Sequence, residues 1–151
     1  MELEGKHALV CGSTQGIGLS TAQLMALRGA TITLMARNED KLKAALTSLD
    51  CSNNQNHDYL VADFSNPSDL EKTIIKFVAA GNTPHILVNN TGGPKGGPII
   101  DANLEEFTST FNQHLICNHI LAQNLYKGMA EMGYGRIINV ISTSVKQPLN
   151  G

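Results

Sequence analysis

The stretch "CGSTQGIG" at residues 11–18 places three glycines directly after the apolar run "HALV". The run predicts a buried strand, and the glycines predict a tight turn that leads into a helix. In such a turn Gly12 allows the reversal, Gly16 lets the backbone approach a ligand, and Gly18 lets the helix pack against the strand. The start of that helix offers free N–H groups to a pyrophosphate. The alternative is that the glycines serve only the turn.

Composition favours one compact domain over residues 1–151. The chain is 42% hydrophobic, and 11 Lys and Arg stand against 13 Asp and Glu without long runs of either sign. This balance argues against nucleic acid and anionic membranes as partners. We therefore expect a small-molecule partner.

The cysteines and the start of the chain favour a reducing compartment of the cell. Cys11, Cys51 and Cys117 are odd in number and form no Cys-x-x-Cys pair, so neither a disulfide framework nor a zinc site is expected. The start "MELEGKHALV" does not resemble a secretory leader, and no apolar stretch approaches the ~20 residues of a membrane helix. We expect a cytoplasmic protein.

Five short apolar runs alternate with helical patterns along the chain. The runs cover residues 7–11, 31–36, 58–62, 85–89 and 136–141. Both parities of these runs are apolar, which is typical of parallel strands covered on both faces. The alternation predicts an α/β fold with a doubly wound parallel (Rossmann) sheet in the strand order 3-2-1-4-5.

Helix ends are also readable. Asn38 predicts the cap of one helix, Asn66-Pro67 opens another, and Gly81 ends it. A longer helix is expected from about Leu104 to Met132, before Gly133 and Gly135. The apolar residues that we expect on its buried side are Phe107, Phe111, Leu115, Leu121, Leu125 and Met129.

The ends of the strands indicate a ligand, because open parallel sheets bind ligands there. Arg37 follows the second run without a carboxylate, which favours the 2′-phosphate of NADP over NAD or S-adenosylmethionine. Asp63 and Phe64 suit an adenine ring, and residues 90–92 bring backbone close to the ribose and nicotinamide. A solvated charge, a polar strand end and a plain turn are the respective alternatives. The expected cofactor-binding residues are Gly12, Ser13, Gln15, Gly16, Ile17, Gly18, Arg37, Asn38, Asp63, Phe64, Asn90, Thr91 and Gly92.

Three motifs resemble those of the short-chain dehydrogenase/reductases. "CGSTQGIG" is similar to their Thr-Gly-x-x-x-Gly-x-Gly motif, with Cys11 in the Thr place, and "NNTG" at 89–92 is similar to Asn-Asn-Ala-Gly. "GRIINVIS" at 135–142 is similar to the strand that leads to the catalytic Ser, which implies this role for Ser142. The resemblance implies an NAD(P)-dependent oxidoreductase. In that family the Ser orients the substrate carbonyl, a Tyr donates a proton, a Lys lowers the Tyr pKa, and an Asn supports a water relay.

Two departures from the family pattern stand out. His114 occupies the Asn position, and the Tyr-x-x-x-Lys pair is expected after the end of this sequence, since Tyr59, Tyr126 and Tyr134 have no Lys four residues on. The "GGPKGGP" loop, residues 142–151 and His114 resemble a divergent, 3-oxoacyl-acyl-carrier-protein reductase-like branch. We therefore expect the N-terminal portion of a longer Rossmann domain.

His114 has three interpretations: support of the relay through its backbone carbonyl, a surrogate acid, or an ordinary polar residue of the long helix. Ser142 has a catalytic role or is one hydroxyl at a strand end. The leading hypothesis is an NADP-dependent reductase of a ketone or aldehyde, homo-oligomeric at full length. The alternatives are a nucleotide-binding sensor or scaffold without turnover and a methyltransferase, the latter disfavoured by Arg37.

Overall fold

The structure is a computed structural model that describes residues 2–94 and 96–147. Its five strands form one sheet in the order β3-β2-β1-β4-β5, and every neighbouring pair is parallel. The predicted fold class and strand order are therefore confirmed. The strands are β1 (His7–Cys11), β2 (Thr31–Ala36), β3 (Asp58–Val61), β4 (Ile86–Asn89) and β5 (Arg136–Asn139).

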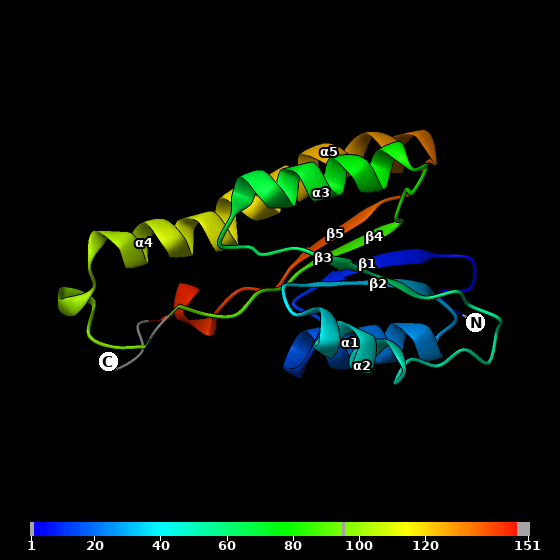
Figure 1. Ribbon diagram of the computed structural model, residues 1–151, viewed down its shortest axis with the longest axis horizontal. Helices are drawn as coiled ribbons and strands as arrows, with labels where there is room; N and C mark the ends of the chain where they lie inside the picture. Colours follow the sequence, from blue (N-terminus) through cyan, green and yellow to red (C-terminus); the bar gives the residue numbers. More distant parts are fainter. Residues whose placement is uncertain (1, 95, 148–151) are drawn as a thin grey trace.

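Helices cover both faces of the sheet (Figure 1). Helices α1 (Gly16–Leu27) and α2 (Glu39–Leu46) lie on one face, and α3 (Pro67–Ala79) and α5 (Cys117–Glu131) lie on the other. Successive side chains of a strand point to opposite faces, so each central strand feeds two cores. Val10 and Leu34 belong to the core under α1 and α2, whereas Leu9 and Leu87 belong to the core under α3 and α5.

The predicted helix ends are confirmed. The Asn38 side-chain oxygen accepts from the Lys41 backbone N–H at 2.9 Å and caps α2. Asn66 caps α3 in the same way, with Pro67 as the first helical residue. Gly81 follows α3 at a φ of +87°, a conformation that favours glycine.

The predicted long helix is interrupted, and half of its expected buried face is exposed. It consists of α4 (Leu104–Phe111), a π-helical turn η2 (Asn112–Ile116) and α5. Leu121, Leu125 and Met129 are buried, as predicted. The prediction is wrong for Phe107, Phe111 and Leu115, which are 52–56% exposed. The reason is visible in Figure 1, where α4 lies beyond the carboxyl ends of the strands and so has no sheet beneath it.

Strand β5 is partly open on both of its faces. Ile137 and Ile138 are 40% and 45% exposed. β5 is an edge strand, and the helices of the described chain leave it largely uncovered. Its pairing with β4 ends at Asn139, so the strand is shorter than the apolar run predicted.

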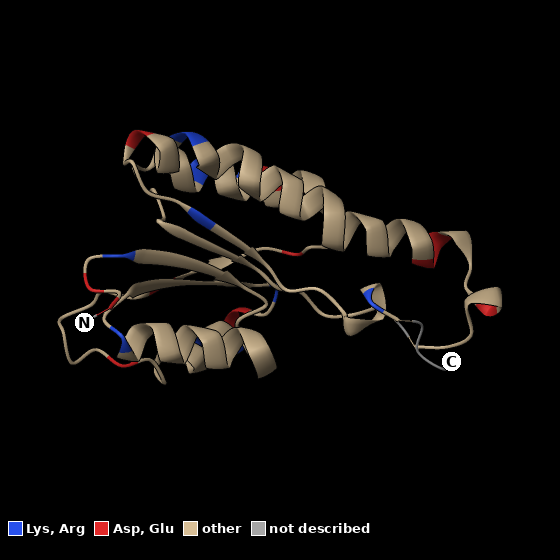
Figure 2. Ribbon diagram, turned by 180° about the vertical axis from the view of Figure 1, so that it is seen from behind, with Lys and Arg blue, Asp and Glu red and all other residues tan. Residues whose placement is uncertain are grey.

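Two short 3-10 turns, η1 (Ile99–Asp101) and η3 (Thr143–Val145), follow β4 and β5. Basic and acidic residues are scattered over the elements rather than gathered on one face (Figure 2). Within the described residues no helix is both long and apolar enough to cross a membrane.

Candidate functional site

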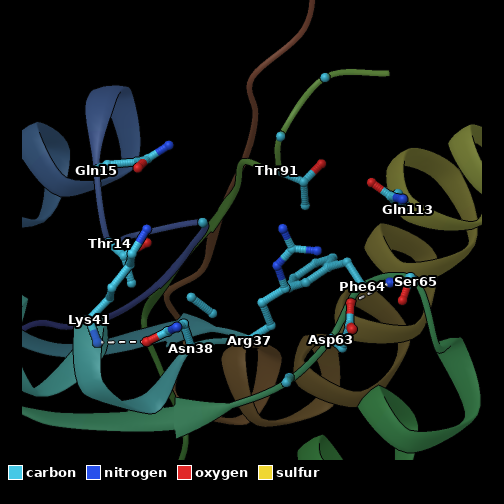
Figure 3. Close-up of a pocket in the computed structure, with 15 residues that line it drawn as sticks. Thr14, Gln15, Arg37, Asn38, Lys41, Asp63, Phe64, Ser65, Thr91 and Gln113 are labelled. Carbon is cyan, nitrogen blue, oxygen red and sulfur yellow. Dashed lines mark hydrogen bonds between the residues drawn. The ribbon is translucent and has the colours of Figure 1, made fainter. Parts of the chain in front are cut away.

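A pocket of about 470 Å³ lies at the carboxyl ends of the strands (Figure 3). It is formed by the segments that follow β1, β2, β3 and β4, together with one residue of η2. This is the place where open parallel sheets bind ligands. The residues that line it are Gly12, Thr14, Gln15, Ala36, Arg37, Asn38, Lys41, Ala62, Asp63, Phe64, Ser65, Thr91, Gly92, Gly93 and Gln113.

The glycine turn fixes the first wall of the pocket. A Cβ on Gly12 would lie 2.4 Å from the Asn90 carbonyl oxygen, and a Cβ on Gly18 would lie 2.3 Å from the Gly12 carbonyl oxygen. Asn90 closes the arrangement by donating from Nδ2 to the carbonyl oxygens of Cys11 and Gly12, at 3.3 and 3.4 Å. Only glycine fits at these two contacts. They hold the start of α1 against the pocket, where its N–H groups suit an anion.

Several predicted cofactor-binding residues support this wall without lining the pocket. Ser13 is fully buried, and its Oγ accepts from the Met35 backbone N–H at 3.0 Å. Ile17 is 62% exposed. Burial raises the pKa of the Cys11 thiol to about 12, so this thiol is neutral at the end of β1. The predicted residues outside the lining are Ser13, Gly16, Ile17, Gly18 and Asn90.

Two cations line the pocket beside the end of β2. Arg37 points into it, and the Lys41 side chain extends from α2 toward Thr14 (Figure 3). Neither cationic group forms an ion pair with a described residue, whereas Lys43 binds Glu39 at 2.9 Å. Unpaired cations that face one pocket suit an anionic ligand such as a phosphate.

Asp63 and Phe64 line the pocket from the segment after β3, the strand next to β2, and Figure 3 draws Phe64 close to Arg37. The Asp63 carboxylate accepts from the Ser65 backbone N–H at 2.9 Å, which fixes the loop after β3. Phe64 is 8% exposed, and its carbonyl oxygen accepts from the Cys117 thiol at 3.3 Å. The flat apolar side chain next to a carboxylate suits an aromatic ring that carries an amino group.

A hydrogen bond joins the loop after β4 to η2. Thr91 Oγ1 lies 3.0 Å from His114 Nδ1, and Thr91 lines the pocket while His114 does not. The other ring nitrogen of His114, Nε2, is buried without a hydrogen-bond partner among the described residues. His114 therefore reaches the pocket only through Thr91.

Ser142 lies at the start of η3, after β5. Its Oγ accepts from the Ser144 backbone N–H at 3.1 Å and lies 2.7 Å from the Ser144 hydroxyl. Ser142 is exposed and does not line the pocket, so the structure does not bring it together with His114 there. In the two stretches linked to the divergent branch, residues 95 and 148–151 lie outside the described residues.

Sequence reasoning missed part of the lining. Lys41 had a readable signal, because it lies four residues after Arg37 on the first turn of a helix that the sequence predicted. No sequence signal indicated Gln113, because the sequence predicted a continuous helix where the structure has the π-helical turn η2. The missed residues are Thr14, Ala36, Lys41, Ala62, Ser65, Gly93 and Gln113.

A second hollow of about 340 Å³ adjoins the pocket and shares Gly93 and Gln113 with it. It extends toward the start of α4, and its lining is mostly polar. The other residues around it are Pro94, Asn103, Glu105, Glu106, Ser109 and Thr110.

The strand order, the glycine turn and the pocket at the strand ends define a Rossmann-type nucleotide-binding fold. The chain belongs to the short chain dehydrogenase family, whose family model matches residues 6–151.

Known relatives agree with this membership. Hydroxysteroid dehydrogenase-like protein 1 of Gallus gallus is 34% identical over 146 residues, which is 95% of this chain and 44% of that protein. The 3-oxoacyl-[acyl-carrier-protein] reductase of Vibrio cholerae is 31% identical over 140 residues, which is 93% of this chain and 56% of that protein. The chain thus spans about half the length of the curated relatives it matches.

A solved structure supports the same assignment. L-sorbose reductase from Gluconobacter frateurii, in complex with NADPH and L-sorbose, is 31% identical and superimposes with a TM-score of 0.89. The match covers 99% of this chain and 57% of that chain.

Proposed function

We propose that the protein carrying this chain is an NADP-dependent oxidoreductase that reduces a ketone or aldehyde to an alcohol. The observation that carries the proposal is that Arg37 and Lys41 both line the pocket beside the end of β2 and form no ion pair within residues 2–94 and 96–147. Of the described residues that line the pocket, only Asp63 carries a carboxylate, and it follows β3 rather than β2. A ribose that carries a 2′-phosphate suits this arrangement better than a ribose with a free 2′-hydroxyl.

The residues present fit the rest of such a cofactor. The N-terminus of α1 would hold the diphosphate, Arg37 and Lys41 the 2′-phosphate, Asp63 and Phe64 the adenine, and residues 90–92 the nicotinamide ribose. When bound, the reduced nicotinamide supplies a hydride to the carbonyl carbon. L-sorbose reductase, which is similar over almost the whole of this chain, was solved with NADPH.

On the carbonyl side we assign Ser142 to the substrate. Its Oγ accepts the Ser144 backbone N–H, which fixes the side chain at the end of β5. A hydroxyl held in this way can donate its own hydrogen to a carbonyl oxygen and orient it for hydride transfer. We assign His114 to the same reaction, through its contact with Thr91.

We also place the protein in the cytoplasm and expect it to act as a homo-oligomer. The three cysteines are free, and the thiols of Cys11 and Cys117 are buried, which suits a reducing compartment. The exposed apolar side chains of α4 and β5 offer a surface for self-association.

The test is turnover by the whole protein. Consumption of NADPH is measured with a panel of ketones and aldehydes, and Ser142→Ala is expected to lower kcat/KM by about 10²-fold, as for the loss of one preorganised donor. Ser68→Ala, at an exposed position of α3 outside the pocket lining, is the matched control for loss of a hydroxyl. NADPH binding without turnover on any carbonyl would contradict the proposal and favour a nucleotide-binding protein without catalysis.

A further inference from the structure

A hydrogen bond joins Thr91, which lines the pocket, to His114, a titratable residue of η2. Thr91 Oγ1 and His114 Nδ1 are 3.0 Å apart. Both groups can donate or accept, so the direction of the hydrogen bond decides what the Thr91 hydroxyl can offer to a ligand.

The far side of the His114 ring sets that direction. Nε2 is buried and has no partner among the described residues. A buried N–H without an acceptor is rarer in proteins than a buried lone pair without a donor. The neutral ring is therefore best satisfied with its hydrogen on Nδ1, which then donates to Thr91 Oγ1.

In this orientation the Thr91 hydroxyl keeps its own hydrogen available for a hydrogen bond to a ligand. Thr91 lines the pocket at the end of β4, and its Oγ1 forms no hydrogen bond with a described residue other than His114. Because the Thr91 oxygen accepts the hydrogen bond from His114, the Thr91 O–H remains able to donate to another group. The phosphate and ribose oxygens of a dinucleotide are acceptors for such a group.

The backbone conformation around His114 also indicates a functional position. The residue lies within the π-helical turn η2, which separates α4 from α5, and π-helical turns inside long helices occur often at functional sites. The next element, α5, is anchored by buried Cys117 and Leu121. The imidazole thus lies on a helical turn that continues into the buried helix α5, whereas Thr91 lies on a loop.

We propose that His114 is a positioning residue: its Nδ1–H holds the Thr91 hydroxyl so that this hydroxyl donates a hydrogen bond to an oxygen of the nucleotide bound in the pocket. The hydrogen bond from Thr91 to the nucleotide rests on the proposed NADP function. The direction of the hydrogen bond between His114 and Thr91 does not depend on that function.

The first experiment is a double-mutant cycle on NADPH affinity, measured by calorimetry with the whole protein. Thr91→Val is expected to weaken NADPH by about 2- to 10-fold, the size of one neutral hydrogen bond, and Thr91→Ser to restore most of the affinity. His114→Gln added to Thr91→Val should cause no further loss, because His114 acts through Thr91. Thr73→Val is the matched control, since its exposed hydroxyl bonds only the Asp69 carbonyl on α3.

Two results of the cycle would overturn the proposal. Unchanged affinity in Thr91→Val removes the ligand contact. Losses that add in the double variant show that His114 acts independently of Thr91. Failure of the wild-type protein to bind NADPH would overturn the ligand contact together with the proposed cofactor.

The second experiment needs neither ligand nor activity. Long-range proton–nitrogen spectra at a pH of about 8, where an unperturbed imidazole is neutral, report which ring nitrogen carries the hydrogen. The His114→Gln spectrum identifies the His114 signals among the five histidines. We expect the hydrogen on Nδ1, and a hydrogen on Nε2 would overturn the orientation of the pair.

Discussion

At the scale of single residues, the wall of the pocket depends on close backbone contacts among the segments that contain Gly12, Gly18 and Asn90. Gly12 and Gly18 pack against each other, and Asn90 donates to the carbonyl oxygens at the end of β1. A side chain at either glycine would meet backbone atoms, which cannot rotate away. The turn is therefore required by packing as well as by any ligand.

Gly18→Ala is expected to lower both stability and nucleotide affinity. The new Cβ would lie 2.3 Å from the Gly12 carbonyl oxygen, so the loop must move away from α1. Overpacking of this kind costs about 1–3 kcal/mol of unfolding free energy. Urea unfolding of the whole protein measures the stability, and NADPH titration measures the affinity.

Gly92→Ala is the matched control for Gly18→Ala. Gly92 has nothing within 4 Å of an added Cβ, so its stability should change by less than about 0.5 kcal/mol. Equal stability loss in the two variants would contradict the packing explanation.

The sequence predicted much of this wall, and the reasons it fell short are local. The glycine spacing, Arg37 and Asp63 could be read because each follows a recognisable apolar run. Ser13 stays a predicted cofactor residue, and its hydroxyl also accepts from the Met35 backbone N–H, a contact between the turn after β1 and strand β2 that spacing does not reveal. Lys41 enters the pocket only because α2 starts immediately after β2.

At the scale of elements, histidines hold the amino ends of the strands, opposite the pocket. His85 Nδ1 accepts from the His7 backbone N–H at 3.1 Å, and His7 Nε2 lies 2.7 Å from Thr33 Oγ1. His57 Nδ1 accepts from the Ile32 backbone N–H at 3.0 Å. Acceptance by a ring nitrogen requires that it be unprotonated.

Stability is expected to fall in mild acid for this reason. Burial, with neighbouring His85, holds the pKa of His7 below its ordinary value despite the opposing effect of Asp58, and burial with Lys6 lowers the pKa of His85. The unfolded chain then takes up protons at a higher pH than the folded chain. The stabilisation is fully present above pH about 6.5 and is lost as pH falls toward the folded pKa values.

Urea midpoints at pH about 7.5 and about 5.5 measure this dependence around the ordinary pKa of His. The double variant His7→Gln and His85→Gln should show a smaller difference between the two midpoints than the wild type. His119→Gln, at an exposed position of α5, is the matched control and should keep the wild-type difference. An unchanged difference in the double variant would rule out these histidines as its source.

The elements themselves show where apolar spacing is a reliable guide and where it is not. Central strands β1, β2 and β4 are buried on both faces, as their composition predicted. Phe107, Phe111 and Leu115 continue the spacing of the buried residues Leu121 and Leu125. They are exposed because α4 lies beyond the carboxyl ends of the strands. Spacing alone could not separate the exposed half of the helix from the buried half. The π-helical turn left no mark in the pattern.

At the scale of the whole molecule, exposed apolar side chains lie on α4 and on the edge strand β5. Ile137, Ile138 and Val140 are 37–45% exposed on or just after the edge strand, and Phe107 and Phe111 are more than half exposed. An apolar edge strand with free backbone groups favours pairing with another chain. Residues 1–151 expressed alone are therefore expected to associate.

Sedimentation at several concentrations tests this association. Ile138→Lys should shift the population toward monomer, because a charge on an edge strand opposes pairing. Ile75→Lys on α3, where the native side chain is 49% exposed, is the matched control and should leave association unchanged. A chain that is monomeric at every concentration would contradict the role assigned to β5.

We propose that the pocket binds a nucleotide with a 2′-phosphate, held by Arg37 and Lys41. Calorimetric titration of the whole protein and of Arg37→Ala with NADPH and with NADH tests this proposal. We expect tighter binding of NADPH by the wild type. In the variant we expect a loss of about 1.5–3 kcal/mol for NADPH, the range for a hydrogen bond to a charged group, and hardly any loss for NADH. Equal losses for the two nucleotides would contradict the account.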